Sequence, residues 1–209
     1  MNSPGARAVT VHYERAAAGY SARRDRGLAG LLRQREQAAV LELLQAGAGQ
    51  SILDVGCGDG AVARRLTARG GWVVAVDLTL AMASMAHRRG IPAVAADMQD
   101  LPFRPRLEAI ACIGSSEFVP CLDLATAEMA ASLRPGGELV LLIPRRNWLG
   151  GALWVFHRLN GVRIFVRSRR AVARALAAAG FEPPVVWRRC AAAWVCHTRL
   201  GRPPGGGEV

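Results

Sequence analysis

A glycine-rich turn between a strand-like run and a helix-like run constrains the fold of this chain more than any other feature. The segment LDVGCGDG, residues 53–60, ends an apolar run and leads into a helical pattern over 61–69. Glycines at such a turn adopt backbone angles that side chains forbid, so the backbone can approach a bound nucleoside closely. The next apolar run, 72–76, ends in Asp77, the place where a doubly wound sheet binds ribose hydroxyls. The pattern predicts a nucleoside-binding α/β domain.

The spacing of the turn argues against a dinucleotide as the ligand. Dinucleotide-binding turns read G-x-G-x-x-G, and their helix N-terminus faces a pyrophosphate. Here the glycines read G-x-G-x-G, with Asp54 upstream of them and Asp59 between them. Two carboxylates are badly placed for a pyrophosphate. They suit a cationic ligand, one that carries an ammonium and a sulfonium. A turn that is only structural, or that serves another nucleotide, is the alternative, because a fold does not fix a function.

Strand-like and helix-like runs alternate along most of the chain, which predicts an α/β fold with a doubly wound, mostly parallel sheet. A loose start over 1–10 precedes helices over 11–44, with breaks near Gly19 and Gly27, and two final strands form a hairpin. The expected strands are 51–55, 72–76, 92–96, 108–113, 137–143, 185–189 and 193–199, and the expected later helices are 60–69, 79–89, 122–133 and 168–179.

Five segments, in order along the chain, resemble the class I S-adenosylmethionine-dependent methyltransferases. The closest resemblance is to the type 11 group, typified by ubiquinone- and menaquinone-biosynthesis methyltransferases. It spans roughly Tyr13 to Phe181 and rests on the segments 53–60, 75–79, 96–103, 133–139 and 179–181. The resemblance implies a seven-stranded Rossmann-like sheet whose last strand is antiparallel. It also implies S-adenosyl-L-methionine as cofactor, S-adenosyl-L-homocysteine as product, and a small-molecule acceptor.

The resemblance further implies which residues surround the cofactor. Asp54 faces the ammonium through water, Asp77 binds the ribose hydroxyls, and Asp97 accepts a hydrogen bond from the adenine amine. Glycines of the turn line the methionine and ribose, and the end of strand 108–113 flanks the sulfonium. The full set expected to bind the cofactor is Tyr20, Asp54, Gly56, Cys57, Gly58, Gly60, Asp77, Leu78, Asp97, Met98, Ile113 and Gly114.

Methyl transfer is an in-line displacement that needs alignment first, and a base only where the acceptor must lose a proton. Glu117, in the loop after strand 108–113, is a candidate base or a holder of a cationic amine. The alternative is a carboxylate that caps a helix N-terminus. His157 is a second candidate base. The alternative is a histidine that packs against other side chains or faces the solvent.

The N-terminal helical segment, 11–46, is expected to form a cap over the cofactor. In relatives such a segment closes over the site, so Tyr13 or Tyr20 covers the cofactor or else packs between helices. Arg33 and Arg35 are candidates to reach a carboxylate of the cofactor or substrate.

An insertion over 144–167 is expected to form a substrate lid. Asn147 can cap a largely apolar helix over Trp148 to Leu159, which is too short to span a bilayer. Arginines beside aromatic residues also fit an anionic membrane surface. With this insertion the chain is expected to be a single methyltransferase domain over 1–200, followed by a disordered tail over 201–209.

Charge is distributed unevenly along the chain. All 27 basic residues are arginines against 16 acidic residues, and no acid lies between Leu139 and Phe181, where eight arginines stand. The asymmetry indicates an anionic partner or a solvated basic face. Five cysteines without a C-x-x-C pair indicate reduced thiols with no metal or disulfide role. No secretory signal is recognisable, so a cytoplasmic location is expected.

The sequence therefore predicts a cytoplasmic S-adenosylmethionine-dependent methyltransferase whose acceptor is a small molecule, with anionic and amphipathic molecules among the candidates. The acceptor atom can be oxygen, nitrogen, carbon or sulfur. The alternatives are methylation of a lipid or quinone at a membrane surface, and a cofactor-binding module without catalysis. Nucleic acid is not the expected partner, because no RNA-binding module or stacking platform accompanies the arginines.

Overall fold

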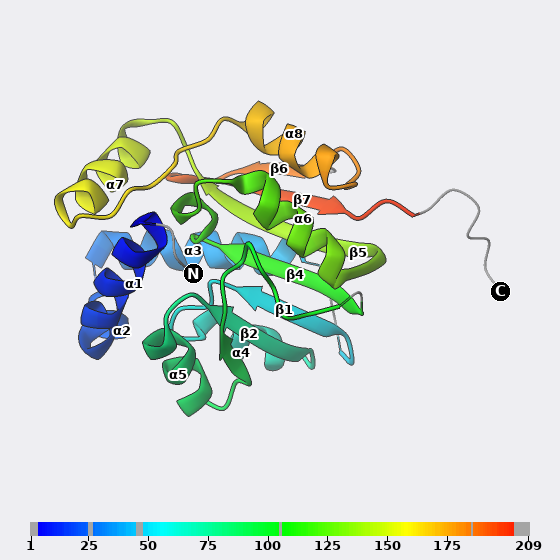
Figure 1. The fold of residues 1–209 in the computed structure, drawn as a ribbon, viewed down its shortest axis with the longest axis horizontal. Helices are drawn as coiled ribbons and strands as arrows, with labels where there is room; N and C mark the ends of the chain where they lie inside the picture. The colour runs from blue at the N-terminus through cyan, green and yellow to red at the C-terminus, as the bar shows by residue number, and fades with distance from the viewer. Residues whose placement is uncertain (1–3, 25–26, 45–47, 105, 185, 203–209) are drawn as a thin grey trace.

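The computed structural model describes residues 4–24, 27–44, 48–104, 106–184 and 186–202, and it is built around one seven-stranded sheet (Figure 1). The strand order is β3-β2-β1-β4-β5-β7-β6. Strands β1 to β5 pair in parallel, whereas β7 runs antiparallel to both β5 and β6. The strands are β1 Ser51–Val55, β2 Trp72–Asp77, β3 Ala93–Ala95, β4 Leu107–Ile113, β5 Leu133–Pro144, β6 Val186–Arg189 and β7 Ala193–Arg199. The predicted fold class, including the antiparallel end of the sheet and the final hairpin, is confirmed.

Helices precede, separate and follow the strands much as the periodicity predicted. The helices are α1 Pro4–Ala16, α2 Tyr20–Arg24, α3 Gly27–Leu43, α4 Ala61–Thr67, α5 Leu80–Arg88, α6 Leu122–Ser132, α7 Trp148–Leu159 and α8 Arg169–Ala178, with short 3-10 turns η1 Ala17–Gly19 and η2 Ser116–Phe118. Asn147 accepts a hydrogen bond from the Gly150 amide at 3.0 Å, which confirms the predicted cap of α7. Ser168 caps α8 in the same way.

Alternating strand residues build a core on each face of the sheet. On one face, Ile52 of β1 and Val140 of β5 pack with buried residues of α3 and α4. On the other face, Leu53 and Leu139 pack with buried residues of α6 and α8. Because neighbouring strand residues point to opposite faces, a one-residue shift in either strand would exchange the two cores.

Two expectations about element boundaries are wrong. The start of the chain is helical from Pro4, because Val9 is buried against Val162 and Ile164, a contact that the local sequence does not announce. Strand β5 begins at Leu133 and not at 137, because Leu133 pairs with Leu107 before a shift in register.

The C-terminal segment was expected to be a disordered tail from 201 onward. The Gly201 amide donates to the Gly180 carbonyl at 3.0 Å, so the chain is still tied to the fold there. Residues 203–209 lie outside the described residues, as do residues 1–3 of the predicted loose start.

Candidate active site

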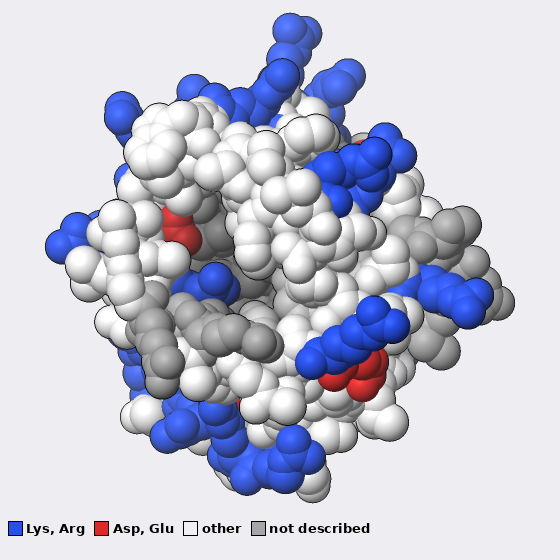
Figure 2. Space-filling model, turned by 90° about the vertical axis from the view of Figure 1, so that its left-hand side faces the viewer, with Lys and Arg blue, Asp and Glu red and all other residues white. Residues whose placement is uncertain are grey.

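The carboxyl ends of the central strands open into a cavity of about 1240 Å³. The N-terminal helices and α7 form its outer walls, and Figure 2 shows this side of the molecule hollowed, with acidic and basic atoms at the hollow. A smaller cavity of about 80 Å³ adjoins it. The two cavities share six lining residues, which are Tyr13, Tyr20, Gly56, Gly58, Gly114 and Phe118. Ligands commonly bind at this edge of an open α/β sheet.

The smaller cavity brings together the acidic ends of β2 and β3. It is lined by Asp77, Leu78, Asp97 and Met98, four of the predicted cofactor residues. The Asp77 carboxylate accepts hydrogen bonds from the Gly58 amide at 2.9 Å and from the Thr79 amide and hydroxyl at 3.0 Å. Burial raises the pKa of Asp77, and these hydrogen bonds act in the opposite direction. The glycine turn and the end of β2 are thus locked together.

Four of the five predicted turn residues do face the larger cavity, and one does not. Asp54, Gly56, Cys57 and Gly58 line it, although the buried Asp54 carboxylate also accepts the Ala63 amide at the start of α4. Gly60 lines neither cavity, because a Cβ there would lie 2.9 Å from that of Ala86. Gly60 serves the packing of the turn against α5.

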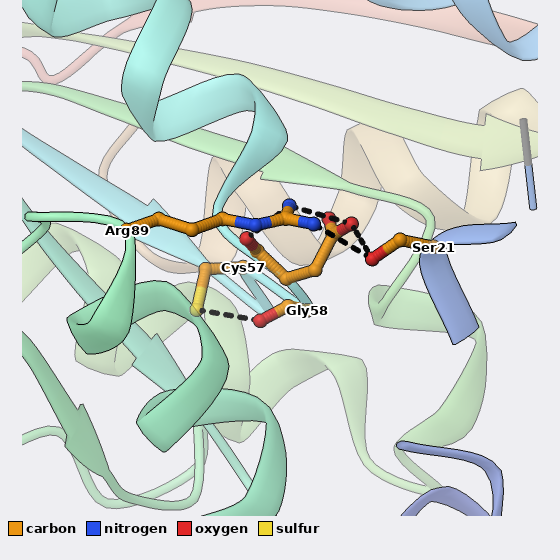
Figure 3. A network of polar contacts seen from close by, with 5 residues as sticks. Ser21, Cys57, Gly58 and Arg89 are labelled. Carbon is orange, nitrogen blue, oxygen red and sulfur yellow. Dashed lines mark hydrogen bonds and ion pairs between the residues drawn. The ribbon is translucent and has the colours of Figure 1, made fainter. Parts of the chain in front are cut away.

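Asp59, the other acid of the turn, lines neither cavity and takes part in a polar network with Ser21 and Arg89, drawn in Figure 3. Its buried carboxylate pairs with the Arg89 guanidinium at 2.8 Å and accepts the Ser21 hydroxyl at 2.6 Å. Arg89 also donates to the Asp59 carbonyl and to the Ser21 hydroxyl, both at 2.8 Å. The network fastens α2 to the glycine turn and to the end of α5.

Arg89→Ala is expected to destabilise the protein by about 2–4 kcal/mol, because the buried Asp59 carboxylate loses its cation. The effect is below that of a fully buried pair, since the Arg89 side chain is 31% exposed. Urea unfolding measures the loss. Arg88→Ala is the matched control, because Arg88 is exposed at the adjacent position and should change the unfolding free energy by less than about 0.5 kcal/mol. Equal effects of the two variants would contradict the structural role of the network.

Glu117 lies where the two cavities meet. Its Oε1 is 3.9 Å from the position that a Cβ on Gly114 would occupy, and its buried Oε2 has no hydrogen-bond partner among the described residues. Burial raises the pKa of Glu117 to about 7. The insertion after β5 holds this loop: the Phe165 amide donates to the Glu117 carbonyl at 2.7 Å, and Arg167 donates to the Ser116 carbonyl at 3.1 Å.

His157 reaches the same cavity from α7. It is buried, and its Nδ1 has no partner in the described part of the chain. Burial, together with the nearby charges of His12 and Arg33, lowers the pKa of His157 to about 4, so the ring is neutral at pH 7. The rings of Phe118 and His157 lie 5.1 Å apart, and Tyr13 contacts Phe118 and Tyr20 at 5.6 and 6.0 Å. These rings form a continuous aromatic wall between the cavities.

The remaining predicted residues divide between the cavity and the surface. Ile113 and Gly114 lie at the end of β4 and line the larger cavity, as does the exposed Arg33. Arg35 is exposed and lines neither cavity, so it is not brought to the site.

Several polar residues of the cavity were not predicted, among them His12, Gln37 and Glu36. Glu36 lines the cavity from α3, and its Oε1 is buried with no hydrogen-bond partner among the described residues. Burial raises the pKa of Glu36. The sequence signal of Glu36 is faint, because it lies next to Gln37 in a helix whose other buried residues include the apolar Ala39, Val40 and Leu41.

Comparison with known proteins agrees with this geometry. Residues 53–141 match the family described as Methyltransferase domain. The demethylmenaquinone methyltransferase of Mycobacterium tuberculosis is 34% identical over 104 residues, 49% of this chain and 44% of that protein. The fatty-acid O-methyltransferase of Mycolicibacterium smegmatis is 36% identical over 96 residues, 43% of this chain and 35% of that protein. These matches span less than half the length of the curated relatives.

Solved structures share the fold at low sequence identity. The methyltransferase in complex with the Haloferax volcanii Trm112 activator superposes with a TM-score of 0.79 at 14% identity, covering 91% of this chain and 98% of that chain. Magnesium protoporphyrin IX methyltransferase from Synechocystis gives a TM-score of 0.74 at 14% identity, covering 93% and 98%. The architecture is that of the Rossmann-like methyltransferases. Residues 53–141 thus match the methyltransferase family, and this part of the chain is similar to demethylmenaquinone and ubiquinone-biosynthesis methyltransferases.

Proposed function

We propose that this protein transfers a methyl group from S-adenosylmethionine to a small-molecule acceptor held in the larger cavity. The observation that carries the proposal is the junction of the two cavities at Gly114. Two of the segments assigned to the cofactor, 75–79 and 96–103, line the smaller cavity, and the glycine turn lines both. Glu117, whose Oε2 has no hydrogen-bond partner among the described residues, lines the larger cavity beside Gly114. This is the arrangement that a two-substrate displacement requires, because it brings acceptor and donor together at one point.

The residues of the smaller cavity fit the cofactor. Asp77 would accept hydrogen bonds from the ribose hydroxyls, with the Gly58 and Thr79 amides holding its carboxylate in place. Asp97, whose Oδ1 accepts the Gln99 amide at 3.0 Å, would accept from the adenine amine beside Met98. The cofactor supplies an electrophilic methyl group on a sulfonium. Gly114 leaves room for that group, because the only described atom within 4 Å of a Cβ there would be Oε1 of Glu117.

Glu117 would act as the general base for an acceptor that must lose a proton. A base is most effective when its pKa lies near the working pH, and burial brings the pKa of Glu117 to about 7. Its Oε2 has no hydrogen-bond partner in the described part of the chain, so it has no hydrogen bond to break there before it accepts the proton. The aromatic wall and the neutral His157 would exclude water while the acceptor is in place, with α7 acting as the lid.

Isothermal titration with S-adenosylhomocysteine tests the cofactor site. We expect binding on the order of micromolar for the wild type, and a loss of about 100-fold in Asp77→Ala, because two charge-assisted hydrogen bonds disappear. Asp100→Ala is the matched control, since Asp100 is exposed and lines neither cavity. A folded wild-type protein that binds no S-adenosylhomocysteine would overturn the proposal.

The exposed face of α7 favours a second candidate, methylation of a lipid or quinone at a membrane surface. Trp148 is 78% exposed and Leu159 is 82% exposed, and the large apolar residues exposed on this helix are Trp148, Trp154, Val155, Phe156 and Leu159. Such a patch is unusual on a free surface. The exposed Arg146, Arg158 and Arg163 lie on or beside the same helix, a combination that suits an anionic interface. In the described ranges, no helix combines the length and apolarity that crossing a bilayer requires.

Vesicle co-sedimentation separates the two candidates. If the second holds, the protein sediments with phosphatidylglycerol vesicles at low salt, much less at about 0.5 M salt, and not with phosphatidylcholine, because screening weakens electrostatic attachment. Replacing Trp148 and Leu159 with Ser should remove binding, whereas Leu28→Ser, at an exposed leucine of α3, should not. If the protein sediments with none of the vesicles, the membrane-surface candidate is excluded, and the candidate with an acceptor that diffuses freely is the one left.

A further inference from the structure

Three buried polar atoms without a partner face one cavity from three different elements. They are Glu36 Oε1 on α3, Glu117 Oε2 on η2 and His157 Nδ1 on α7, and none has a hydrogen-bond partner in the part of the chain that is described. Buried polar groups without partners are rare, and each costs about 1–3 kcal/mol. Their convergence on one cavity indicates that a ligand supplies the missing hydrogen bonds.

The two carboxylates belong to one electrostatic site. The charge of Glu36 acts on Glu117, and Arg33 attracts both. Arg33 itself is exposed, as are Arg7 and Arg15, the other arginines that line the cavity. The cations therefore lie at the solvent side of the cavity, whereas the acidic groups lie in its buried part. A ligand group that enters the buried part must donate hydrogen bonds there and must not be an anion.

The cavity that contains the two carboxylates also has apolar walls. Helices α1, α3 and α7 contribute Val11, Leu32, Leu149, Leu153 and Phe156 to its lining. An acceptor that fills this space has an apolar body and a compact polar head. The head is the part that meets Glu36 and Glu117.

We propose that Glu36 and Glu117 together bind an acceptor head group that carries two or more hydrogen-bond donors, an amine or a vicinal dihydroxy aromatic ring. The inference rests on the proposed function, since it takes the larger cavity as the acceptor site. Glu36 is then a specificity-determining residue that holds one donor, and Glu117 accepts the proton from the atom to be methylated. The neutral His157 accepts or donates the third hydrogen bond.

The chemical step balances for both head groups. An ammonium gives one proton to the Glu117 carboxylate, and the freed nitrogen lone pair forms the new N–C bond to the methyl carbon. The C–S bond breaks and its electron pair stays on sulfur, which leaves an N-methylammonium and a neutral thioether. A hydroxyl likewise gives its proton to Glu117, and its oxygen forms the new O–C bond. No oxidant, reductant or metal is needed in either case.

The test is a titration with probes that share an apolar body and differ in the head group. 4-Phenylbutylamine, 4-butylcatechol and 4-phenylbutyrate supply an ammonium, two hydroxyls and a carboxylate, and each is titrated into the protein with and without saturating S-adenosylhomocysteine. We expect the amine or the catechol to bind at least about tenfold more tightly than the carboxylate, which corresponds to one charge-assisted hydrogen bond. Because the titration without S-adenosylhomocysteine does not need a working cofactor site, failure of the cofactor site cannot mask the result.

Two substitutions at Glu36 distinguish the two head groups. Glu36→Gln keeps an oxygen acceptor but loses the charge, so it should weaken amine binding by about tenfold and catechol binding by less than about threefold. Glu36→Leu removes both properties and should weaken both. Glu42→Gln is the matched control on the same helix, outside the cavity, and should change neither.

The inference is overturned if the carboxylate probe binds as tightly as the other two, or if neither Glu36 variant changes the affinity for any probe. Binding of S-adenosylhomocysteine by the Glu36 variants, at wild-type affinity, shows that they are folded and that any loss is confined to the acceptor site. A Glu36 variant that loses S-adenosylhomocysteine binding as well would also overturn it, because Glu36 would then support the cofactor site and not the acceptor.

Discussion

Glu117→Gln is expected to lower kcat for methyl transfer by about 10²–10⁴-fold, the usual contribution of a general base. The amide keeps the shape of the side chain and cannot take a proton from the acceptor. Affinity for S-adenosylhomocysteine should stay within about twofold of the wild type, because the cofactor residues are on other elements. Single-turnover methylation of an accepted probe, beside titration with S-adenosylhomocysteine, measures the two effects separately. Equal losses of kcat and of cofactor affinity would mean that Glu117 supports the site structurally.

The same substitution should remove a pH dependence. In the wild type, kcat/KM for an acceptor that must lose a proton rises with pH through about 7, since Glu117 has to be ionised and burial raises its pKa to about 7. The variant should show no such rise of kcat/KM around pH 7. A rise that persists in Glu117→Gln would mean that another group titrates there.

Glu117 also links the activity to the stability of the fold. Its pKa is raised from 4.5 to about 7 by burial, so the folded protein favours the protonated form. The resulting stabilisation is complete below pH 4.5 and is lost as the pH rises through about 7. At pH 8 the ionised carboxylate, whose Oε2 has no hydrogen-bond partner among the described residues, thus costs about 3 kcal/mol relative to pH 4.

Urea unfolding at two pH values should show this cost. Glu117→Gln should be more stable relative to the wild type at pH 8 than at pH 5, by about 1–3 kcal/mol, because the amide cannot ionise. Glu182→Gln, at an exposed position, should show no difference between the two pH values. A substitution that lowers activity and raises stability indicates a side chain that is kept for function although it destabilises the fold.

The elements predicted best from the sequence are those whose signals are local. Strand β1 and helix α7 have the predicted bounds, because an apolar run followed by glycines fixes the first and the Asn147 side chain caps the second. The placement of Asp77 at the smaller cavity also follows from a local rule, since the carboxyl ends of parallel strands share one edge.

The features that were missed depend on contacts between distant segments. Glu36 looks like any acidic residue of a helix until α3 is packed over the end of the sheet and its Oε1 is enclosed. Gly60 belongs to the same glycine pattern as Gly56 and Gly58, yet its space is filled by Ala86 of α5. A motif thus indicates that a turn is tight, whereas tertiary packing decides which of its glycines faces a ligand.

Gly56→Ala is expected to have the largest effect on the cofactor site. Gly56 has φ +70°, and a Cβ there would lie 2.2 Å from the Ser115 Cβ. The backbone angle alone costs about 1–2 kcal/mol for alanine, and overpacking adds about 1–3 kcal/mol. Ser115 cannot move freely, because its hydroxyl donates to the Val55 carbonyl at 3.0 Å. The turn must therefore shift away from the end of β4, where it lines both cavities.

Two other glycine substitutions separate the clash from the strain. At Gly58, φ is +55° and a Cβ would lie at an ordinary 3.5 Å from the Tyr20 ring. At Gly49, φ is +81° and a Cβ would meet none of the described residues within 4 Å. Each should lose about 1–2 kcal/mol in urea unfolding, against about 2–5 kcal/mol for Gly56→Ala. S-Adenosylhomocysteine affinity should fall by about 100-fold or more in Gly56→Ala and remain unchanged in Gly49→Ala. If Gly56→Ala behaved like Gly49→Ala in both measurements, close packing of the turn on Ser115 would not be what shapes the cofactor site, and backbone strain alone would account for the glycine.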